Sequence, residues 1–485
     1  MKFNFRLILR LLGILILFNG LFMATCLPFS YYYKEESAIA ILVSSGITIL
    51  VGMILILLNP EKEDRELRKR DGYLIVTFGW LAMSFTGTIP YLLTGAIPSF
   101  TDAFFETMSG YTTTGASILT DIESLPKGIL FWRSLTQWIG GMGIIVLTVA
   151  ILPILGIGGM QLFVAEAPGI SPDKLKPRIR ETAIRLWMIY LILTVSELIL
   201  LKLGGMSFFD AINHSLTTMA TGGFSTKNAS IAHFKSPFIH YVIVIFMFLA
   251  GTNFTLTYFG LHGKIKKIWN NEEFRFYSVS ILIMSIIVGF IIFKSTDYYL
   301  EPSFRSSLFS IVSIISTTGY VTVDYTSWNP QITMFFFMLM FIGASAGSTA
   351  GGVKFVRHVI LLKNSILEMK RLIHPHAVLP LRFNHRPVTQ DITFNVLAFM
   401  ILYIMVFAIG SVIMSYIGVD FITAVGSVAT SMGNIGPGIG SVGPVNNFAH
   451  IPIEGKWWLS FLMLLGRLEL FTVLILFMPY FWRKY

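Results

Sequence analysis

Four segments that end in glycine hold the residues whose types and spacing could do chemistry. They can be laid over one another without gaps: "DAFFETMSGYTTTG" from Asp102, "DAINHSLTTMATGG" from Asp210, "SSLFSIVSIISTTG" from Ser306 and "TAVGSVATSMGNIG" from Thr423. Each begins with a residue type that caps helix N-termini and ends with glycine, which permits positive φ. A short helix followed by such a loop can aim successive carbonyls one way, and rings of carbonyls replace the hydration shell of an alkali cation. We interpret the four segments as one cation site.

The predicted ligands are the backbone oxygens at and just before each closing glycine. A single Thr-Gly after a short helix is usually only a helix C-cap, but four such segments in one register favour the cation site. The register is open in two segments, where Gly222 could replace Gly223 and Gly433 could replace Gly436. The predicted filter residues are Thr113, Thr114, Gly115, Thr221, Gly222, Gly223, Thr317, Thr318, Gly319, Asn434, Ile435 and Gly436.

The composition places this site in a membrane. The chain has 485 residues, of which 54% are hydrophobic and 13% charged, and its mean hydropathy is +0.71, outside the balance of soluble domains. A helix that crosses the bilayer needs about 20 apolar residues, and the sequence predicts ten such helices. Their approximate ranges are 7–29, 38–59, 73–94, 129–154, 184–203, 237–261, 276–293, 332–357, 392–417 and 456–482.

The position of the four segments predicts the fold. Each lies between two predicted spans, and its short helix is too short to cross the bilayer, so it must enter and return. We expect an all-α membrane protein whose last eight spans form four helix–pore loop–helix repeats with pseudo-fourfold symmetry. The predicted units are 1–72 with two additional spans and a basic loop, 73–183 for repeat 1, 184–275 for repeat 2, 276–391 for repeat 3 with a Gly-rich gating segment, and 392–485 for repeat 4.

The basic residues predict the orientation. Most of the 36 Lys and Arg residues fall into the loops on one side if the N-terminus is inside, which is the positive-inside pattern. Both termini are therefore expected in the cytoplasm. The net charge of +10 follows from this bias and needs no nucleic acid to explain it.

Two intramembrane features suggest a gate below the cation site. The stretch "GASAGSTAGG", Gly343 to Gly352, lies inside the eighth predicted span; its small residues could serve close helix packing or mark a broken helix. Arg467 lies near mid-bilayer, where a charge is costly unless it faces protein or water. Glu469 is a poor partner for it, because residues i and i+2 point apart on a helix. We predict that Arg467 faces the pore axis and holds carbonyls of the Gly-rich stretch. The predicted gate residues are Gly343, Gly347, Gly351, Gly352 and Arg467.

The four segments, together with "PRIRETAIRLW" from Pro177, "GASAGSTAGGVKFVRH" from Gly343 and "LGRLELFT" from Leu465, resemble the TrkH subunit of the Trk/Ktr/HKT superfamily of potassium transporters. The resemblance covers essentially the whole chain. It implies a homodimeric, K⁺-permeable subunit of the bacterial inner membrane, with no cofactor of its own. It also implies a cytosolic nucleotide-binding ring of the TrkA type, for which the basic loops 172–185 and 367–387 are the expected docking surface.

Several details and alternatives stay open. Asn434 and Ile435 stand where the other segments carry hydroxyls, so we predict that K⁺ and Rb⁺ pass with weaker selectivity against Na⁺. A symporter coupled to H⁺ or Na⁺ is one alternative. A polytopic membrane enzyme using Glu106 or His214 is another, but the sequence shows no catalytic constellation around them, and we expect no enzyme. Lys354 and Arg357 are expected as ordinary snorkelling residues at the inner end of the eighth span.

Overall fold

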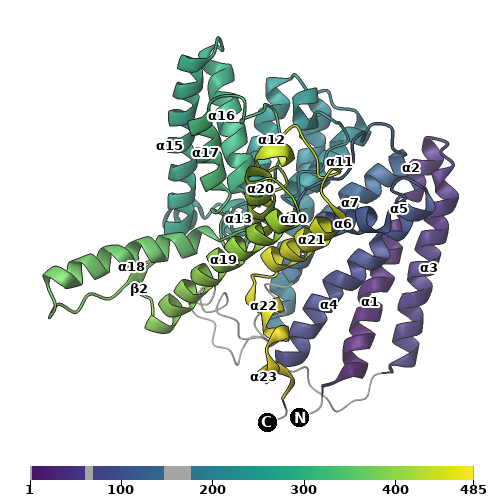
Figure 1. Ribbon diagram of the computed structural model, residues 1–485, viewed down its shortest axis with the longest axis horizontal. Helices are drawn as coiled ribbons and strands as arrows, with labels where there is room; N and C mark the ends of the chain where they lie inside the picture. The colour runs from purple at the N-terminus through teal and green to yellow at the C-terminus, as the bar shows by residue number, and fades with distance from the viewer. Residues whose placement is uncertain (1–2, 61–68, 147–175, 484–485) are drawn as a thin grey trace.

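The computed structural model describes residues 3–60, 69–146 and 176–483. This part of the chain is almost entirely helical, with a single two-stranded pairing between β1 (Arg382–Phe383) and β2 (Arg386–Pro387). The described ends of the chain lie close together at one pole of the molecule (Figure 1). The all-helical architecture expected from the hydropathy pattern is confirmed.

Within the described residues, six helices are long and apolar enough to cross a membrane, and two bent pairs raise the number to eight. The six spans are Phe5–Tyr32, Ser37–Leu58, Arg70–Leu93, Ile184–Leu203, Glu272–Ser295 and Gln390–Tyr416. The bent pairs are Pro237–Ala250 with Phe254–Leu261 and Ile453–Arg467 with Phe471–Phe477, each with an angle of 112°. A gentle curve does not explain such an angle, so each pair is a broken helix.

The N-terminal helices pack as a close antiparallel pair. A Cβ added at Gly52 would lie 2.6 Å from the backbone nitrogen of Leu17, and one at Gly20 would lie 2.7 Å from Ile49. Small residues let membrane helices approach in this way. The helices of this part are α1 (Phe5–Ala24), α2 (Leu27–Tyr32), α3 (Ser37–Leu58), α4 (Lys69–Gly87) and α5 (Ile89–Leu93).

Four short helices alternate with the longer ones in the rest of the chain. The short helices are α6 (Phe100–Tyr111), α11 (Phe208–Met219), α16 (Leu300–Ile315) and α20 (Phe421–Gly433). The longer or broken helices between them are α7 (Lys127–Val146), α10 (Lys176–Leu203), α12 (Pro237–Ala250), α13 (Phe254–Leu261), α15 (Glu272–Ser295), α17 (Pro330–Leu339), α18 (Phe355–Ile373), α19 (Gln390–Tyr416) and α21 (Ile453–Arg467). The remaining elements are η3 (Ser230–His233), α14 (Ile265–Trp269), η4 (Gly440–Val442), α22 (Phe471–Leu474), η5 (Ile475–Phe477) and α23 (Pro479–Trp482).

The structure corrects the predicted caps of the short helices. Asp102 and Asp210 lie in the first turn, whereas Ser99 and Ser207 accept their backbone N–H groups as the N-caps. Asp420 caps α20 in the same way. Ser306 lies inside α16, which begins at Leu300. The caps of α6, α11 and α20 lie three residues before the aligned segments, and the cap of α16 is Tyr299, because all four helices begin before the segments do.

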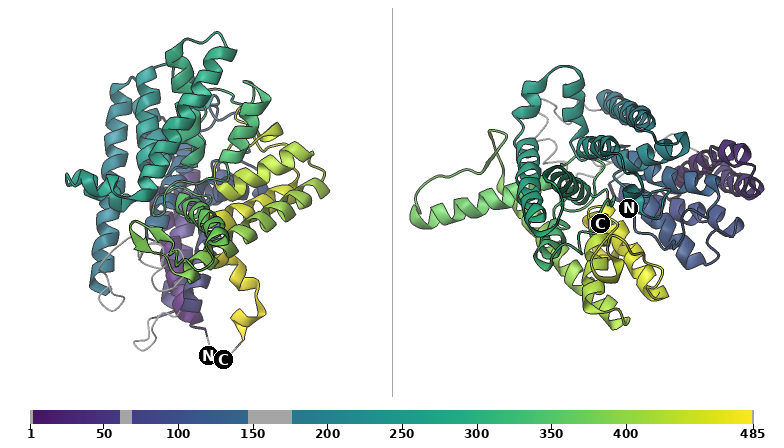
Figure 2. Two further views of the ribbon diagram at one scale, coloured as in Figure 1. Left: turned by 90° about the vertical axis from the view of Figure 1, so that its left-hand side faces the viewer. Right: turned by 90° about the horizontal axis from the view of Figure 1, so that it is seen from above.

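The eighth predicted span, 332–357, is not one helix. Its helix α17 stops at Leu339, the Gly-rich stretch follows without helical structure, and α18 begins at Phe355. Helix α18 then projects sideways from the body of the molecule (Figures 1 and 2). The predicted span 129–154 is helical from Lys127 to Val146, and its remainder lies outside the described residues.

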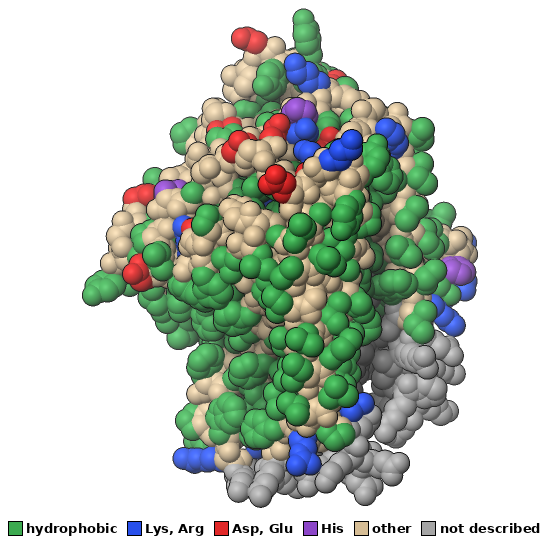
Figure 3. Space-filling view, turned by 90° about the vertical axis from the view of Figure 1, so that its right-hand side faces the viewer, with side chains coloured by type: hydrophobic (Ala, Val, Ile, Leu, Met, Phe, Trp, Pro, Cys, Tyr) green, Lys and Arg blue, Asp and Glu red, His purple; other side chains and the backbone are tan. Residues whose placement is uncertain are grey.

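The molecular surface has the banding expected of a membrane protein. A broad apolar zone covers the middle of the face shown in Figure 3, while charged side chains of both signs gather near its upper rim and Lys and Arg side chains border its lower one. Helix α3 carries exposed apolar side chains, such as Leu50, Leu57 and Leu58. Contact of these apolar side chains with lipid hydrocarbon is favourable, whereas their contact with water would be unfavourable.

Candidate cation-binding site

The four short helices end in the same hydrogen-bonded motif. In each, a residue with positive φ donates its N–H to the carbonyl three residues earlier, and the next residue donates to the carbonyl five residues earlier. This is the Schellman C-cap, which satisfies the last helical carbonyls. The residues with positive φ are Thr113 (52°), Thr221 (53°), Thr317 (56°) and Asn434 (52°). All four segments therefore form a helix C-cap, which is the structure that a single Thr-Gly pair would suggest.

The chain then continues in the same way in all four loops. Two residues beyond the cap, φ is again positive, at Gly115 (82°), Gly223 (77°), Gly319 (77°) and Gly436 (103°). A conformation with φ in this range is costly for residues with a Cβ and free for glycine. The backbone therefore gives the four loops one common register, in which Gly223 and Gly436 are the equivalent closing glycines.

The four loops close into a ring. A Cβ added to each closing glycine would collide with, or press against, the carbonyl oxygen just before the closing glycine of the next loop. The contacts run from Gly115 to Gly222, from Gly223 to Thr318, from Gly319 to Ile435, and from Gly436 back to Thr114. Because the fourth loop meets the first, all four surround a common axis, and side chains are excluded where they meet.

Most carbonyl oxygens of the ring are free of hydrogen-bond donors. Among the described residues, the Gly222 oxygen is the one filter oxygen that accepts a hydrogen bond, from Gln137 Nε2 at 2.6 Å. In each loop the caps use the N–H groups of the residue with positive φ and of the residue after it, whereas most of the carbonyl oxygens have no described donor. Unpaired buried carbonyls are costly unless something replaces water, and a cation on the axis would do so.

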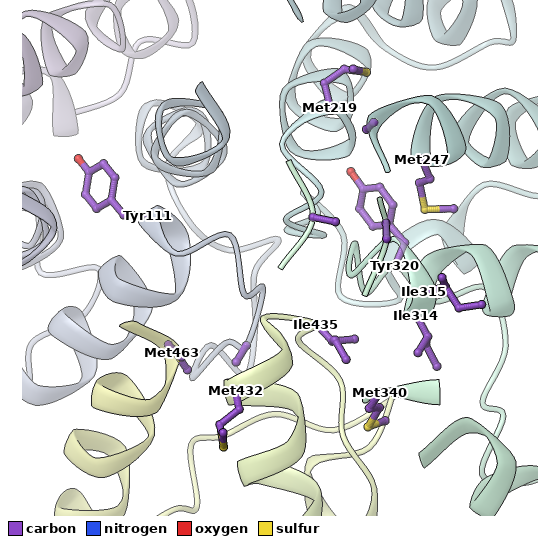
Figure 4. Packing of buried hydrophobic residues seen from close by; sticks show 14 of the residues in the cluster. Tyr111, Met219, Met247, Ile314, Ile315, Tyr320, Met340, Met432, Ile435 and Met463 are labelled. Carbon is purple, nitrogen blue, oxygen red and sulfur yellow. The ribbon is translucent and has the colours of Figure 1, made fainter. Parts of the chain in front are cut away.

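Large apolar side chains anchor the helix ends behind the ring. Tyr111, Met219, Ile315 and Met432 occupy equivalent positions at the ends of α6, α11, α16 and α20, and each has no exposed surface. Figure 4 shows these side chains arranged around the loop ends together with Tyr320 and Ile435. Close packing resists small displacements, so the loops are held at fixed positions. On the outer side, all four closing glycines line one hollow of about 100 Å³, enough for a few water molecules.

The Gly-rich stretch lies directly against the inner end of the ring. Gly351 donates its N–H to Thr317 Oγ1 at 2.7 Å, and a Cβ at Gly351 would lie 2.6 Å from Cβ of Asn434. Gly343 donates to Val353 O at 2.7 Å, which pins the two limbs of the loop together. Gly347 and Gly352 have φ of 72° and 66°, so the turns of this loop depend on glycine.

Arg467 donates hydrogen bonds to the Gly-rich loop and to α7. The residue is 1% exposed, and its guanidinium donates to Thr349 O at 2.7 Å and to Gly140 O at 3.0 Å. These two carbonyls belong to the Gly-rich loop and to α7, so one side chain ties the loop to the helix of another segment. The helix carrying Arg467 ends there, because Glu469 and Leu470 both have positive φ.

The structure overturns the expectation for Lys354 and Arg357. Both are buried rather than snorkelling: Lys354 Nζ donates to Ala350 O, and Arg357 forms an ion pair with Glu469 at 2.5 Å. The guanidinium of Arg357 also stacks on Phe399, 3.9 Å from the ring centroid. They are buried because the chain breaks after α17, so these residues lie at the start of α18, beneath the ring, instead of at the inner end of one continuous span.

Sequence analysis also missed the carboxylate that clasps the Gly-rich loop. Glu273, in the first turn of α15, accepts N–H groups from Ala346 at 2.8 Å and from Val356 at 3.2 Å. One side chain therefore ties the Gly-rich loop to the first turn of α18. An acidic residue in a first turn is ordinary in sequence, and nothing in a single sequence distinguishes a clasp from a cap.

The two residues considered for an enzymatic role are both engaged in packing the outer ends of the loops. Glu106 is fully buried, forms an ion pair with Arg133 at 2.7 Å, and accepts the N–H of Ile118 at 2.9 Å. His214 contacts the Asp210 carbonyl at 2.7 Å and Ser225 Oγ at 2.9 Å. These contacts give both side chains a structural role beside the ring.

Comparison with known proteins identifies the family. The model of the family described as "TrkH: Cation transport protein" matches residues 39–484. The chain belongs to the TrkH family. It is 40% identical over 486 residues to the Trk system potassium uptake protein TrkH of Escherichia coli K12, covering 99% of this chain and 100% of the relative. It is 39% identical over 484 residues to the TrkH of Halomonas elongata, with 99% and 100% covered.

A solved TrkH structure shares the whole fold. The crystal structure of the potassium transporter TrkH from Vibrio parahaemolyticus superposes with a TM-score of 0.91 at 37% identity, covering 99% of this chain and 100% of that one. The TrkG protein of Escherichia coli K12 is 35% identical over 482 residues, with 99% of each chain covered. The TrkH family consists of multi-pass membrane transporters for potassium rather than enzymes.

Proposed function

We propose that this chain forms the K⁺-conducting pore of a Trk uptake system in a bacterial inner membrane. The observation that carries the proposal is the closed ring of four glycine loops, with carbonyl oxygens that other donors leave free. Ten membrane spans, the last eight in four pseudo-symmetric repeats with the unit boundaries predicted above, account for this ring. The filter comprises the twelve predicted residues, and K⁺ is held by their backbone oxygens alone.

The Gly-rich loop and Arg467 form the gate of this pore. The loop contacts Thr317 and Asn434 from below, and Arg467 places a positive charge at the same level. In this state the charge repels a cation leaving the filter, while the loop fills its path. Opening requires the loop to move out of this path. That movement breaks the hydrogen bond that Arg467 donates to Thr349 O and the hydrogen bond that Glu273 accepts from Ala346.

Two partners fit the described surface. Helix α18 exposes an apolar stripe at helical spacing, formed by Leu362, Ile366, Met369 and Ile373, and a second copy of the chain would cover it in a homodimer. A cytosolic TrkA-like ring, which carries the regulatory nucleotide, docks on the basic segment 367–387. Residues 172–175 of the other predicted docking loop, 172–185, lie outside the described residues. Both termini are then cytoplasmic.

The test is a flux assay in liposomes that contain the purified chain. We expect K⁺ and Rb⁺ to pass and Na⁺ to pass less well, because carbonyl rings of this kind substitute for the hydration of the larger ions. A strong preference for Na⁺ would refute the filter assignment. Addition of a TrkA-like ring with nucleotide should raise the flux, whereas the ring should change nothing if the basic segment is only a topology signal.

One observation favours coupled transport as a second candidate. Glu197 of α10 is completely buried at membrane depth, has no ion pair within the described residues, and lies beside the Thr218 hydroxyl of α11. A buried intramembrane carboxyl is a common proton carrier. Reversal potentials measured across a pH gradient separate the two: a pore follows the K⁺ gradient alone, while a symporter shifts with pH and loses that shift in Glu197→Gln.

A further inference from the structure

The ring of carbonyls is not uniform, because one side chain reaches into it from another segment. Gln137 of α7 is fully buried. Its amide nitrogen donates to Gly222 O at 2.6 Å, and its amide oxygen accepts the N–H of Phe224 at 3.1 Å. Gln137 of α7, in the first repeat, thus holds the second loop by hydrogen bonds on both sides of its closing glycine, Gly223.

The identity of residue 222 follows from this contact. A Cβ added at Gly222 would overlap the Gln137 carboxamide. At the equivalent positions of the first and third loops stand Thr114 and Thr318, whose hydroxyls pair at 2.8 Å with the hydroxyls two residues earlier. The second loop has Ala220 and Gly222 there. The amide of Gln137 occupies the space that a threonine side chain fills in the other two loops.

The Gly222 oxygen nevertheless keeps its place in the ring. The Gly222 oxygen lies against Gly115 of the first loop. The Thr318 and Ile435 oxygens lie against Gly223 and Gly319 in the same way. One of the four oxygens at this level therefore already accepts an N–H. An amide proton beside a carbonyl oxygen reduces the negative potential that the oxygen presents to a cation.

We propose that Gln137 determines the ion selectivity of the pore by weakening the Gly222 carbonyl and fixing its distance from the axis. The proposal rests on the filter assignment made above. A ring of weaker field repays the dehydration of K⁺ and Rb⁺ but not that of the smaller, more strongly hydrated Na⁺. The number and field strength of the carbonyls are the quantities on which such selectivity depends.

Contacts from Arg133 hold the second loop independently of Gln137, so a change in selectivity can be told apart from a displaced loop. It lies one helical turn before Gln137 on the same face of α7, donates to Ser225 O at 2.9 Å, and stacks on Phe224 at 3.6 Å from the ring centroid. These contacts hold the second loop when the Gln137 amide is removed. A variant at Gln137 therefore changes the Gly222 carbonyl more than the path of the chain.

The experiment measures the K⁺/Na⁺ flux ratio of Gln137→Met in liposomes. We expect the ratio to fall about tenfold, the effect of one buried hydrogen bond. Ser134→Ala on the same helix, which removes a hydroxyl whose one hydrogen bond among the described residues goes to Leu130 O at 3.2 Å, should leave the ratio unchanged. The ratio does not depend on how much protein is reconstituted, so a purely structural role of Gln137 would not move it.

A suppressor pair gives a second, independent test. Gly222→Thr alone should abolish K⁺ flux because the new side chain collides with Gln137, and Gln137→Ala should restore flux in the double variant. An unchanged flux ratio in Gln137→Met, or a double variant as inactive as Gly222→Thr, would overturn the proposal. Absence of K⁺ flux in the unaltered protein would instead refute the proposed function itself.

Discussion

Removal of the Arg467 side chain should open the pore. In Arg467→Ala, the hydrogen bonds to Thr349 O and Gly140 O are lost together with the charge below the filter. Hydrogen bonds from a charged donor contribute about 1.5 kcal/mol or more each, so the closed position of the loop loses about 3 kcal/mol. Since 1.4 kcal/mol corresponds to a factor of ten, the population with the loop displaced should rise about 100-fold.

The assay is ⁸⁶Rb⁺ uptake into liposomes in the absence of any partner subunit. The matched control is Lys456→Met, which removes another buried positive charge from α21 but one that pairs with Asp102 at the outer end, at 2.6 Å. Basal uptake should rise in Arg467→Ala and stay close to the unaltered level in the control, because the Lys456 ammonium bonds to Asp102 and to Ala449 O at the outer end and makes no described contact with the Gly-rich loop. Unchanged basal uptake in monodisperse Arg467→Ala protein would refute the gating role and leave Arg467 as a packing residue.

Three further variants probe other contacts. Gly319→Ala should abolish Rb⁺ uptake, because the added Cβ would collide with the Ile435 carbonyl. The control Gly46→Ala, whose Cβ would lie within 4 Å of no atom, should leave uptake unchanged. Full uptake in Gly319→Ala would contradict the ring geometry. Glu273→Gln weakens the clasp on Ala346 and Val356 and should raise basal uptake about tenfold, the worth of one charged hydrogen bond; a fall in uptake would argue against the clasp. Arg133→Met leaves the Glu106 carboxylate buried without its partner and should cost about 3–5 kcal/mol of stability, visible as a lower melting temperature in detergent; an unaltered melting curve would show that the pair is dispensable.

The sequence predicts the backbone of the four loops where the cause is local. Each short helix ends in a left-handed residue, and a glycine with positive φ follows two positions later. The residues of the loop itself specify this conformation, so aligning the four segments is enough to predict it. Gly223 and Gly436 emerge as the closing glycines only in the structure, because two neighbouring glycines in one sequence leave the register open. Positive φ at these positions decides it.

The parts that could not be predicted depend on partners far apart in the chain. The Arg357–Glu469 pair requires breaks in both α17 and the last span, and the second break occurs at Glu469 and Leu470, two residues that rarely adopt positive φ. The burial of Lys354 follows from the same breaks. Gln137 could not be assigned either, because the carbonyl that it contacts lies 85 positions away.

The most direct test of the central claim is a structure of this chain determined with Rb⁺ or Tl⁺, whose anomalous scattering marks cation positions. The account predicts density on the axis of the ring, bounded by the carbonyl oxygens of Thr114, Gly222, Thr318 and Ile435. Cations bound only elsewhere, with those oxygens facing protein or empty space, would contradict it.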